Sequence, residues 1–402
     1  MRALFVSWDG PDQNYHESLF MPILARSRRP GDEVHLLQYG WGAEAREASV
    51  QAEASRLGMP YTARSVWRTP QVPATVGMIG RGAVDLVRYS RRHRVSVLMP
   101  RSTIPAAMAI LALPALPDVR LLYDADGLMA DERADFGGWS RQGLPYRTLR
   151  AIDDAVVRRA DGVLTRTHRS ASLLAERAGL DDPSKIVVVS NGKDADHFRP
   201  GTARQRAATR EALGVAEGAP LLVHVGTLGP QYYPDRLAAF AATVQARRPD
   251  AHLLILTGNC DLAFAACRDA GLDPSGYTVR RVRPNDVPPY LAAADVGLAI
   301  RMASLSQQAV APIKVGEYLL CGLPVLSTRG IGDLDAQLDA SVGEFVGRLD
   351  AADLERAAGW LLNKVLPERD AFRRACRERG VQTFSLAHSA RQYQAAFDQV
   401  SS

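Results

Sequence analysis

Short apolar segments alternate along the chain with longer segments whose apolar residues recur at helical spacing. In the first half, six segments of four to six mainly apolar residues predict buried strands. They are residues 3–7, 33–38, 96–100, 120–124, 162–165 and 186–189. The segments 43–57, 82–92, 104–111, 146–159 and 170–178 predict helices between them. This alternation of strand and helix predicts a parallel, doubly wound sheet.

The second half repeats the same pattern and predicts a second doubly wound α/β domain. Its predicted strands are 221–225, 253–256, 278–281, 296–300, 325–327 and 343–346. Its predicted helices are 235–247, 262–270, 287–293, 315–320, 353–366, 371–379 and 386–399. Between the halves, the turn-forming segment SNGKDADHFRP precedes an Arg-rich helical connector and a Gly/Pro break. We therefore place the domain boundary at residues 197/198.

Polar loops follow three strands of the first half, where a doubly wound sheet binds its ligands. The loop 8–18 carries Asp9, Asn14, His16 and Glu17, and the loop 167–171 carries His168. His16 could serve a hydroxyl of an acceptor molecule, but an incidental histidine in a polar loop fits the sequence equally well. Thr167 has the residue type and position of a helix cap.

The third loop, residues 124–139, is unusually acidic. Five carboxylates crowd it: Asp124, Asp126, Asp131, Glu132 and Asp135. A metal site is conceivable, but the spacing does not match an EF-hand loop. We favour acceptor binding by Asp126 and Glu132, together with local ion pairing, over a metal.

Four loops of the second half follow strand ends: 225–234, 257–261, 281–289 and 301–312. Gly226 and Gly258 allow a ligand to approach the backbone closely. Each glycine alone is more often a simple turn residue. The convergence of four such loops at one sheet edge favours a binding cleft.

The stretch APIKVGEYLLCGLPVLS, residues 311–327, predicts a helix followed by a buried strand. Pro312 suits a helix start and Gly322 a helix end. Lys314 and Glu317 are three positions apart and so share one helix face. A cation, a carboxylate and a helix N-terminus together suit a phosphate and a sugar diol. The alternative interpretation is a solvated surface ion pair.

Composition narrows the class of protein. The chain has 402 residues, 47% hydrophobic and 23% charged, and no apolar run long enough to cross a membrane. The start MRALFVSWDG reads as a strand rather than a signal peptide, and the four cysteines form no CxxC pair, so we expect a cytoplasmic protein. The net charge is +5, and residues 1–195 hold 26 basic against 22 acidic side chains.

That basic excess could face anionic lipid or an acidic acceptor, although an ordinary Arg-rich surface explains it equally well. No basic–aromatic pattern indicates nucleic acid.

Several motifs in combination resemble glycosyltransferase family 4, whose members are retaining enzymes of the GT-B fold. They are SNGKDADHFRP, VHVGTLG, VPPYLAAADVGL, KVGEYLLCGLPVLS, YDADGLMADERAD and FSLAHSARQYQAAF. The chain is most similar to a bacterial subgroup with a Pro-x-Lys-x-x-Glu-Tyr donor site. The resemblance implies two facing Rossmann-like domains, 1–197 for the acceptor and 198–384 for the donor. It also implies a closing helix, 385–400, that crosses back to complete the first domain.

The resemblance also implies roles for individual residues. Glu317 matches the glutamate that holds the ribose hydroxyls, whereas the family's first glutamate falls on Ala309 and is absent. Thr227 replaces the arginine that grips the diphosphate, which leaves Lys314 and Arg301 as the phosphate cations. The implied donor site comprises Gly226, Thr227, Leu228, Gly258, Arg283, Asp286, Arg301, Lys314, Val315 and Glu317. The expected catalytic residues are Lys314, Glu317 and His16.

We therefore expect a retaining transfer of sugar from a nucleotide-sugar substrate to a glycan, a lipid-linked molecule or a small molecule. Bacterial surface polysaccharide or glycoconjugate synthesis is the expected setting, with the protein peripheral on the inner face of the membrane. No metal is expected to be required, because cations and helix N–H groups can neutralise a leaving diphosphate. Two alternatives are a nucleotide-sugar epimerase or hydrolase of the same fold, and a non-catalytic nucleotide-sugar-binding subunit.

Overall fold

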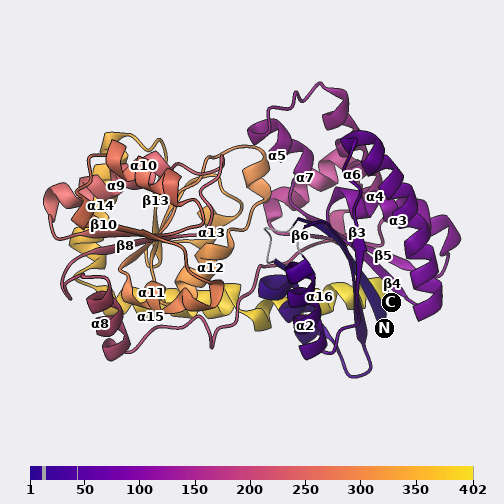
Figure 1. Cartoon of the computed structure of the whole chain (residues 1–402), viewed down its shortest axis with the longest axis horizontal. Coiled ribbons are helices and arrows are strands. Elements are labelled where there is room, and N and C mark those ends of the chain that lie inside the picture. Colours follow the sequence, from indigo (N-terminus) through magenta and orange to yellow (C-terminus); the bar gives the residue numbers. More distant parts are fainter. Residues whose placement is uncertain (11–14, 43, 402) are drawn as a thin grey trace. The chain divides into compact units, whose positions relative to one another are not determined.

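The computed structural model describes residues 1–10, 15–42 and 44–401, and these form two compact units (Figure 1). The first unit comprises Met1–Ser190, Gln308–Val310 and the C-terminal segment from Ser389. The second comprises Asn191–Gln307 and Ala311–His388. The chain thus leaves the first unit at Ser190, seven residues before the boundary placed from the sequence, and returns to it twice.

The first unit is built on a parallel sheet of seven strands in the order β3-β2-β1-β4-β5-β6-β7. The strands are β1 (Arg2–Asp9), β2 (Glu33–Gly40), β3 (Tyr61–Ser65), β4 (Val97–Pro100), β5 (Arg120–Asp126), β6 (Gly162–Thr165) and β7 (Ile186–Val188). The predicted doubly wound α/β sheet is confirmed, with β3 as an additional edge strand. Its sequence YTARS is half polar and only partly buried, so it lacks the apolar signal of the central strands.

Helices cover both faces of this sheet. They are α1 (Met21–Ser27), α2 (Glu44–Arg56), α3 (Gln71–His93), α4 (Thr103–Ala112), α5 (Met129–Phe136), α6 (Leu144–Arg159), α7 (His168–Ala178) and α16 (Leu386–Ser401). Apolar side chains of α3, α4, α6 and α7 share one core with the sheet. On the opposite face, Val400 of α16 lies against Gly162 and Leu122. The expectation of a loop throughout 124–139 is wrong, because α5 forms within it.

The second unit has a parallel sheet of six strands in the order β10-β9-β8-β11-β12-β13. The strands are β8 (Leu221–Val225), β9 (His252–Leu256), β10 (Tyr277–Arg280), β11 (Val296–Ala299), β12 (Val325–Thr328) and β13 (Gly343–Val346). The α-helices are α8 (Ala203–Ala212), α9 (Pro234–Arg247), α10 (Cys260–Asp269), α11 (Pro288–Ala293), α12 (Ile313–Leu320), α13 (Leu334–Gln337), α14 (Ala351–Trp360) and α15 (Arg369–Phe384). The strand order reverses between β8 and β11, and such a switch point is where open α/β sheets bind ligands.

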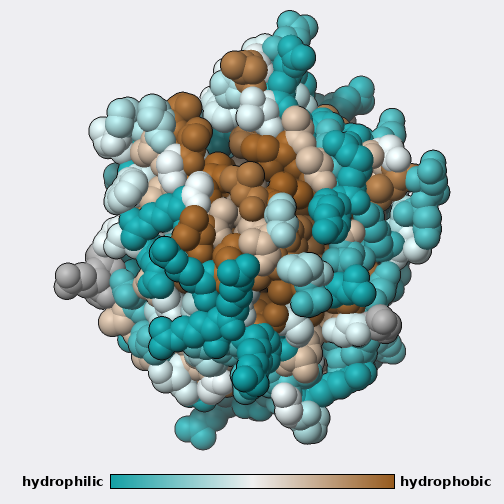
Figure 2. Space-filling view, turned by 90° about the vertical axis from the view of Figure 1, so that its right-hand side faces the viewer, coloured by the Kyte–Doolittle hydropathy of each residue, from teal (hydrophilic) through white to brown (hydrophobic). Residues whose placement is uncertain are grey.

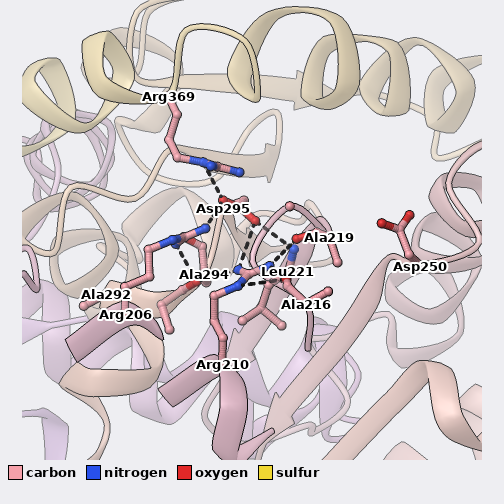
Figure 3. A network of polar contacts seen from close by, with 12 residues as sticks. Arg206, Arg210, Ala216, Ala219, Leu221, Asp250, Ala292, Ala294, Asp295 and Arg369 are labelled. Atoms are coloured by element: carbon pink, nitrogen blue, oxygen red, sulfur yellow. Dashed lines mark hydrogen bonds and ion pairs between the residues drawn. The ribbon is translucent and has the colours of Figure 1, made fainter. Parts of the chain in front are cut away.

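A buried network around Asp295 holds helices to the amino end of β11 (Figure 3). The fully buried Asp295 carboxylate lies 2.7 Å from Arg206, 3.4 Å from Arg210 and 2.9 Å from Arg369. It also accepts a hydrogen bond of 2.9 Å from the Leu221 backbone N–H. The Asp295 carboxylate therefore links α8, β8 and α15. Because it lies at the amino end of β11 and is engaged by these partners, it is not a candidate for ligand binding at the carboxyl ends of the strands.

Along the described parts of the chain, no helix combines the length and the apolar character that crossing a membrane requires. The four cysteines are free thiols, of which Cys267, Cys321 and Cys376 are buried.

Candidate functional site

Lys314 lies at the centre of a cluster of polar side chains at the carboxyl ends of β8 and β11. It occupies the first turn of α12, and its side chain is buried. Its ammonium lies 3.6 Å from the position that a Cβ atom would take at Gly226, directly after β8. Burial lowers the pKa of Lys314, and Arg301 adds to this shift while Tyr232 and Glu317 oppose it.

The ring of Tyr232 contacts two cations. The Lys314 Nζ is 4.3 Å and the Arg301 guanidinium 4.5 Å from the centre of its ring. The Arg301 Nη1 also donates a hydrogen bond of 2.5 Å to the Tyr232 hydroxyl. Burial alone would raise the pKa of this phenol, but the two cations outweigh burial and lower it. The pair of cations is therefore held in place by an aromatic ring.

Arg301 is fixed from two more directions. Its Nε donates a hydrogen bond of 2.7 Å to Gln307, and its backbone N–H donates one of 2.9 Å to the Thr328 hydroxyl. The Arg301 side chain is buried like that of Lys314. Both cations are thus positioned before any ligand arrives, which is the arrangement that stabilises developing negative charge most effectively.

His224 of β8 completes the cluster as a neutral side chain. Burial and the neighbouring Lys314 lower the pKa of His224 well below its usual value. Its Nδ1 lies 3.1 Å from the Leu298 carbonyl oxygen, so we assign the ring proton to Nδ1. The Nε2 lone pair then faces the Lys314 ammonium at 3.5 Å.

Glu317 pairs with Lys193, not with Lys314. The Glu317 Oε1 lies 3.1 Å from the Lys193 Nζ, and both side chains are largely buried. The interpretation of Lys314 and Glu317 as a solvated surface pair is therefore wrong. Lys193 comes from the SNGKDADHFRP segment, and its backbone bonds to Phe384 and Leu386 on either side of Ser385. The Glu317 carboxylate of α12 is thus held by Lys193, which is far from it in the sequence.

Of the glycine loops expected at the donor site, the one at Gly226 lies beside Lys314. Gly226 has φ of +107°, a conformation that favours glycine. Thr227 is exposed, and the backbone N–H of the buried Leu228 donates a hydrogen bond of 3.1 Å to Asn259. Gly258 is exposed, and its carbonyl oxygen accepts a hydrogen bond of 2.9 Å from Arg281.

Three other residues expected at the donor site lie differently. Arg283 and Asp286 form an exposed pair with each other at 2.8 Å, on the loop that follows β10. Val315 is fully buried in the core of the second unit, so its side chain packs the α12 helix rather than facing solvent.

Glycines set the position of α12. A Cβ atom at Gly316 would lie 2.9 Å from Phe384, and one at Gly380 would lie 2.7 Å from the Leu320 backbone nitrogen. Because side chains are absent at both positions, α12 and α15 pack closely along their backbones. Gly322 ends the helix with φ of +73°, as the sequence predicts. Pro312 occupies the N-cap position, one residue before the helix starts.

In the first unit, His16 lies in a buried polar group at the end of β1. Its Nε2 is 2.7 Å from the Ser7 hydroxyl and 3.5 Å from an Asp9 carboxylate oxygen. The ring is 2% exposed, and Phe5 and Phe20 pack against it edge-on. Burial lowers the pKa of His16, so the ring is neutral near pH 7. A neutral imidazole can accept a proton, which keeps the predicted role open.

Glu17 holds the segment after β1 against α2. It pairs with Arg46 through both carboxylate oxygens, one contact being 2.7 Å, and it accepts a hydrogen bond from Ser49. Arg46 outweighs the effect of burial and lowers the pKa of Glu17. Asn14 lies outside the described residues.

Arginines neutralise most of the acidic segment 124–139. Asp124 is buried and bound through both oxygens by Arg166 at 2.8 Å, and Asp126 pairs with Arg101 at 2.7 Å. Asp131 pairs with Arg177, and Asp135 pairs with Arg141. Among the described residues, no three His, Cys, Asp or Glu side chains form a group that could hold a metal ion. Ion pairing accounts for these four aspartates.

Arg101, Asp126 and Arg166 lie at the carboxyl ends of β4, β5 and β6, respectively. Asp126 has φ of +55° and is 38% exposed, and Arg101 and Arg166 outweigh burial and lower its pKa. The Nη1 atoms of both arginines are buried without a hydrogen-bond partner among the described residues. Glu132 lies exposed on α5, and His168 lies exposed at the start of α7. Thr167 caps α7 by accepting a hydrogen bond of 3.0 Å from the Ser170 N–H, as predicted.

Ala309 occupies a buried position. It is 1% exposed and belongs to the apolar core of the first unit, although the chain on either side of Gln308–Val310 belongs to the second. A carboxylate could not replace it there without leaving the apolar core charged.

Five residues of these sites escaped the sequence analysis as functional candidates: Lys193, His224, Tyr232, Arg101 and Arg166. Lys193 and His224 both lie within motifs that were recognised, but nothing near them in sequence indicates their partners. Tyr232 lies in the segment GPQYYPDR, in which no residue of the sequence pattern indicates a contact with Lys314.

Comparison with known proteins finds sequence similarity to glycosyl transferases within the second unit. Residues 219–364 match the family model "Glycosyl transferases group 1". Over 234 residues the chain is 31% identical to D-inositol 3-phosphate glycosyltransferase 2 of Catenulispora acidiphila, covering 54% of this chain and 52% of that protein. The chain thus spans about half the length of the curated relatives that it matches.

Solved structures match over the whole chain. Anabaena HepE in complex with UDP-glucose has a TM-score of 0.74 at 15% identity and covers 99% of both chains. WaaG, a glycosyltransferase involved in lipopolysaccharide biosynthesis, has a TM-score of 0.68 at 18% identity and covers 100% of both chains. At this identity the likeness shows the fold alone, and the expected GT-B fold is confirmed.

Proposed function

We propose that this chain is a glycosyltransferase that moves a sugar from a nucleotide-sugar donor to a hydroxyl group of an acceptor. The observation that carries the proposal is the pair of buried cations, Lys314 and Arg301, at the switch point of the second unit. This pair lies inside the segment that matches the group 1 glycosyl transferases. The HepE complex with UDP-glucose supports a nucleotide sugar as the donor class.

The two cations suit the charge that a leaving diphosphate develops. As the bond between the sugar and phosphate breaks, negative charge builds up on the phosphate oxygens. In the proposed mechanism Lys314 neutralises this charge next to the Gly226–Leu228 backbone, and Arg301, which contacts the same Tyr232 ring, adds a second positive charge. The helix N-terminus of α12 adds a partial positive charge.

Glu317 is the proposed ligand of the ribose hydroxyls. Its carboxylate is held by Lys193 at 3.1 Å and keeps an oxygen for hydroxyl donors. The exposed Arg283–Asp286 loop is proposed to flank the base. The acceptor hydroxyl attacks on the side of the leaving group, which retains the configuration of the sugar, and the departing phosphate takes its proton. No protein nucleophile is then required.

The acceptor is proposed to bind the first unit. Asp9, His16 and Asp126 lie near the strand ends there, and Glu132 and His168 are exposed on α5 and α7. Glycans, lipid-linked intermediates and small molecules remain the candidate acceptors, with bacterial glycoconjugate synthesis at the cytoplasmic side of a membrane as the setting. The inositol phosphate named for the Catenulispora relative is one acceptor to include in assays.

A non-catalytic nucleotide-sugar-binding subunit is the second candidate, and Ala309 is the observation that favours it. An alanine in the apolar core cannot contact a donor sugar as a glutamate would. An epimerase or hydrolase of the same fold would differ in product, since no acceptor glycoside would form.

Substitution of Glu317 tests the proposal. We expect Glu317→Ala to abolish turnover of the nucleotide sugar while the thermal unfolding midpoint stays close to that of the wild type. Glu355→Ala is the matched control, because Glu355 is an exposed glutamate of the same unit, on α14. Normal turnover in Glu317→Ala would contradict the ribose role. Nucleotide-sugar binding without transfer to any acceptor would favour the non-catalytic subunit.

A further inference from the structure

An apolar groove runs along the outer side of the first unit, between α3, α4 and α6. It encloses about 740 Å³, and its walls include Ile79 of α3, Ile110 and Leu111 of α4, and Leu144 and Ile152 of α6. Figure 2 shows apolar side chains gathered on the end of the molecule formed by these helices, bordered by hydrophilic ones. The groove is built from elements of one unit alone.

Large apolar side chains of this face are unusually exposed. Leu144 is 76% and Leu111 58% exposed, at the two edges of the groove. Val72 and Val76, at 72% and 64%, continue the apolar row of Ile79 along α3 at helical spacing. Single exposed apolar residues need no explanation, but a contiguous group of this kind marks an interaction site.

The central helix α4 lacks a polar face. Its sequence TIPAAMAILA contains no charged residue, and Ala106, Met108 and Ala109 pack inward on the core. A helix that is apolar on all sides is normally covered on all sides. The outward Ile110 and Leu111 of α4 instead line the groove, with no described segment of the chain over them.

The two flanking helices are rich in arginine. The helices α3 and α6 carry eight arginines against three aspartates, a formal excess of five positive charges that equals the net charge of the whole chain. The arginines are Arg81, Arg88, Arg91, Arg92, Arg147, Arg150, Arg158 and Arg159. One of the aspartates, Asp153, is buried beneath the surface. Arg147 itself lines the groove.

We infer that this face, the α3–α4–α6 face, docks onto a membrane surface that contains anionic lipids. An apolar groove between basic helices matches the two layers of such a surface, since acyl chains take up apolar side chains and phosphates attract arginines. Long arginine side chains can cover apolar surface with their stems while their heads reach the phosphates. A protein partner would need an apolar ridge with acidic flanks, and no feature of the chain indicates one. The inference does not depend on the proposed function, because no residue of the α3–α4–α6 face belongs to the proposed donor site.

Vesicle sedimentation with the full chain tests the inference. We expect binding to vesicles of phosphatidylcholine and phosphatidylglycerol in equal amounts to be at least about tenfold stronger than binding to phosphatidylcholine alone. Raising the salt concentration from about 0.1 M to about 0.5 M should reduce this binding, because salt screens the arginines. Failure to bind the anionic vesicles at low salt would overturn the inference.

Two variants locate the surface. Leu111→Ser/Leu144→Ser should weaken vesicle binding about tenfold, since it removes exposed apolar groups without opening the core. Arg147→Glu should weaken it and reduce the salt dependence. The control Leu262→Ser/Phe264→Ser changes two exposed apolar residues of α10 in the second unit and should bind like the wild type. Thermal unfolding serves as the check that each variant is folded.

Two results would overturn the inference. In the first, the Leu111→Ser/Leu144→Ser and Arg147→Glu variants bind vesicles as the wild type does. In the second, the wild type is a dimer that Leu111→Ser/Leu144→Ser converts to a monomer, with vesicle binding absent from both, which would identify the groove as an interface between copies of this chain.

Discussion

Lys314 is the residue whose charge we propose decides how well an anion binds at the switch point of the second unit. Its ammonium is buried beside Gly226, Tyr232 and His224, and none of these carries a negative charge near pH 7. An unpaired buried cation is costly, which is why its pKa lies below the usual value. A bound diphosphate would supply the missing negative charge, so the site is arranged to favour that ligand.

The lowered pKa of Lys314 makes nucleotide binding dependent on pH. The ammonium form binds phosphate, and it is lost as pH rises through a pKa that lies below the ordinary value. We therefore expect UDP affinity, measured by calorimetry, to fall as pH is raised from neutral, and to do so before the ordinary lysine pKa of about 10.4 is reached. Lys314→Met should bind UDP more weakly at pH 7.5, by about tenfold or more, and with little pH dependence.

The pKa of Tyr232 is also lowered, and its anion would repel phosphate. Tyr232→Phe separates the two groups: pH dependence that survives in this variant belongs to Lys314. A flat profile in the wild type, or a profile that Lys314→Met leaves unchanged, would contradict the account.

At the scale of elements, the close packing of α12 against α15 keeps Lys314 and Glu317 in place. Gly380→Ala would put a Cβ atom 2.7 Å from the Leu320 backbone nitrogen, so the two helices must separate. We expect a loss of about 1–3 kcal/mol in the free energy of unfolding and a weaker affinity for UDP. Gly77→Ala in α3 is the matched control, since nothing lies within 4 Å of its Cβ position. That control should be neutral or stabilising by up to about 1 kcal/mol. Equal effects of the two variants in denaturant titration would refute this reading.

The Asp295 network is a second set of contacts that joins helices and strands of this unit. Asp295→Asn removes the carboxylate that faces Arg206, Arg210 and Arg369 and leaves buried positive charge uncompensated. We expect a loss of about 3–5 kcal/mol in the free energy of unfolding. Asp250→Asn, at an exposed pair with Arg248, should change it by less than about 1 kcal/mol. A stability of Asp295→Asn close to that of the wild type would show that the network contributes little.

The strands and helices show how much of the fold the hydrophobic pattern alone predicts. Six strands of each half follow from short apolar segments, because central parallel strands are buried on both faces and leave a continuous apolar signal. The edge strand β3 leaves no such apolar signal, because its sequence is half polar. The first half of α3 was missed because it contains Pro73, Gly77 and Gly80, which are poor helix formers. The helix forms there nevertheless, with Ala74 and Met78 packed into the core.

Across the whole molecule, the parts of the sites that escaped prediction depend on partners that are distant in the sequence. The Lys193–Glu317 pair joins residues 124 positions apart, and Tyr232 meets Lys314 across 82 positions. Spacing along one helix suggested a Lys314–Glu317 pair because no local pattern reports such distant partners. The family motifs predicted which residues form the donor site, and the fold shows the contacts that these residues make.

The central claim is that the second unit binds a nucleotide sugar through Lys314 and Glu317. Its most direct test is thermal unfolding of the wild type with UDP, GDP, ADP and CMP sugars, because a ligand that binds the folded state raises the unfolding midpoint. We predict that the sugars of one base raise the midpoint of the wild type and that Lys314→Met and Glu317→Ala each reduce this shift by more than half. No shift with any of these sugars, or equal shifts in the wild type and both variants, would contradict the claim.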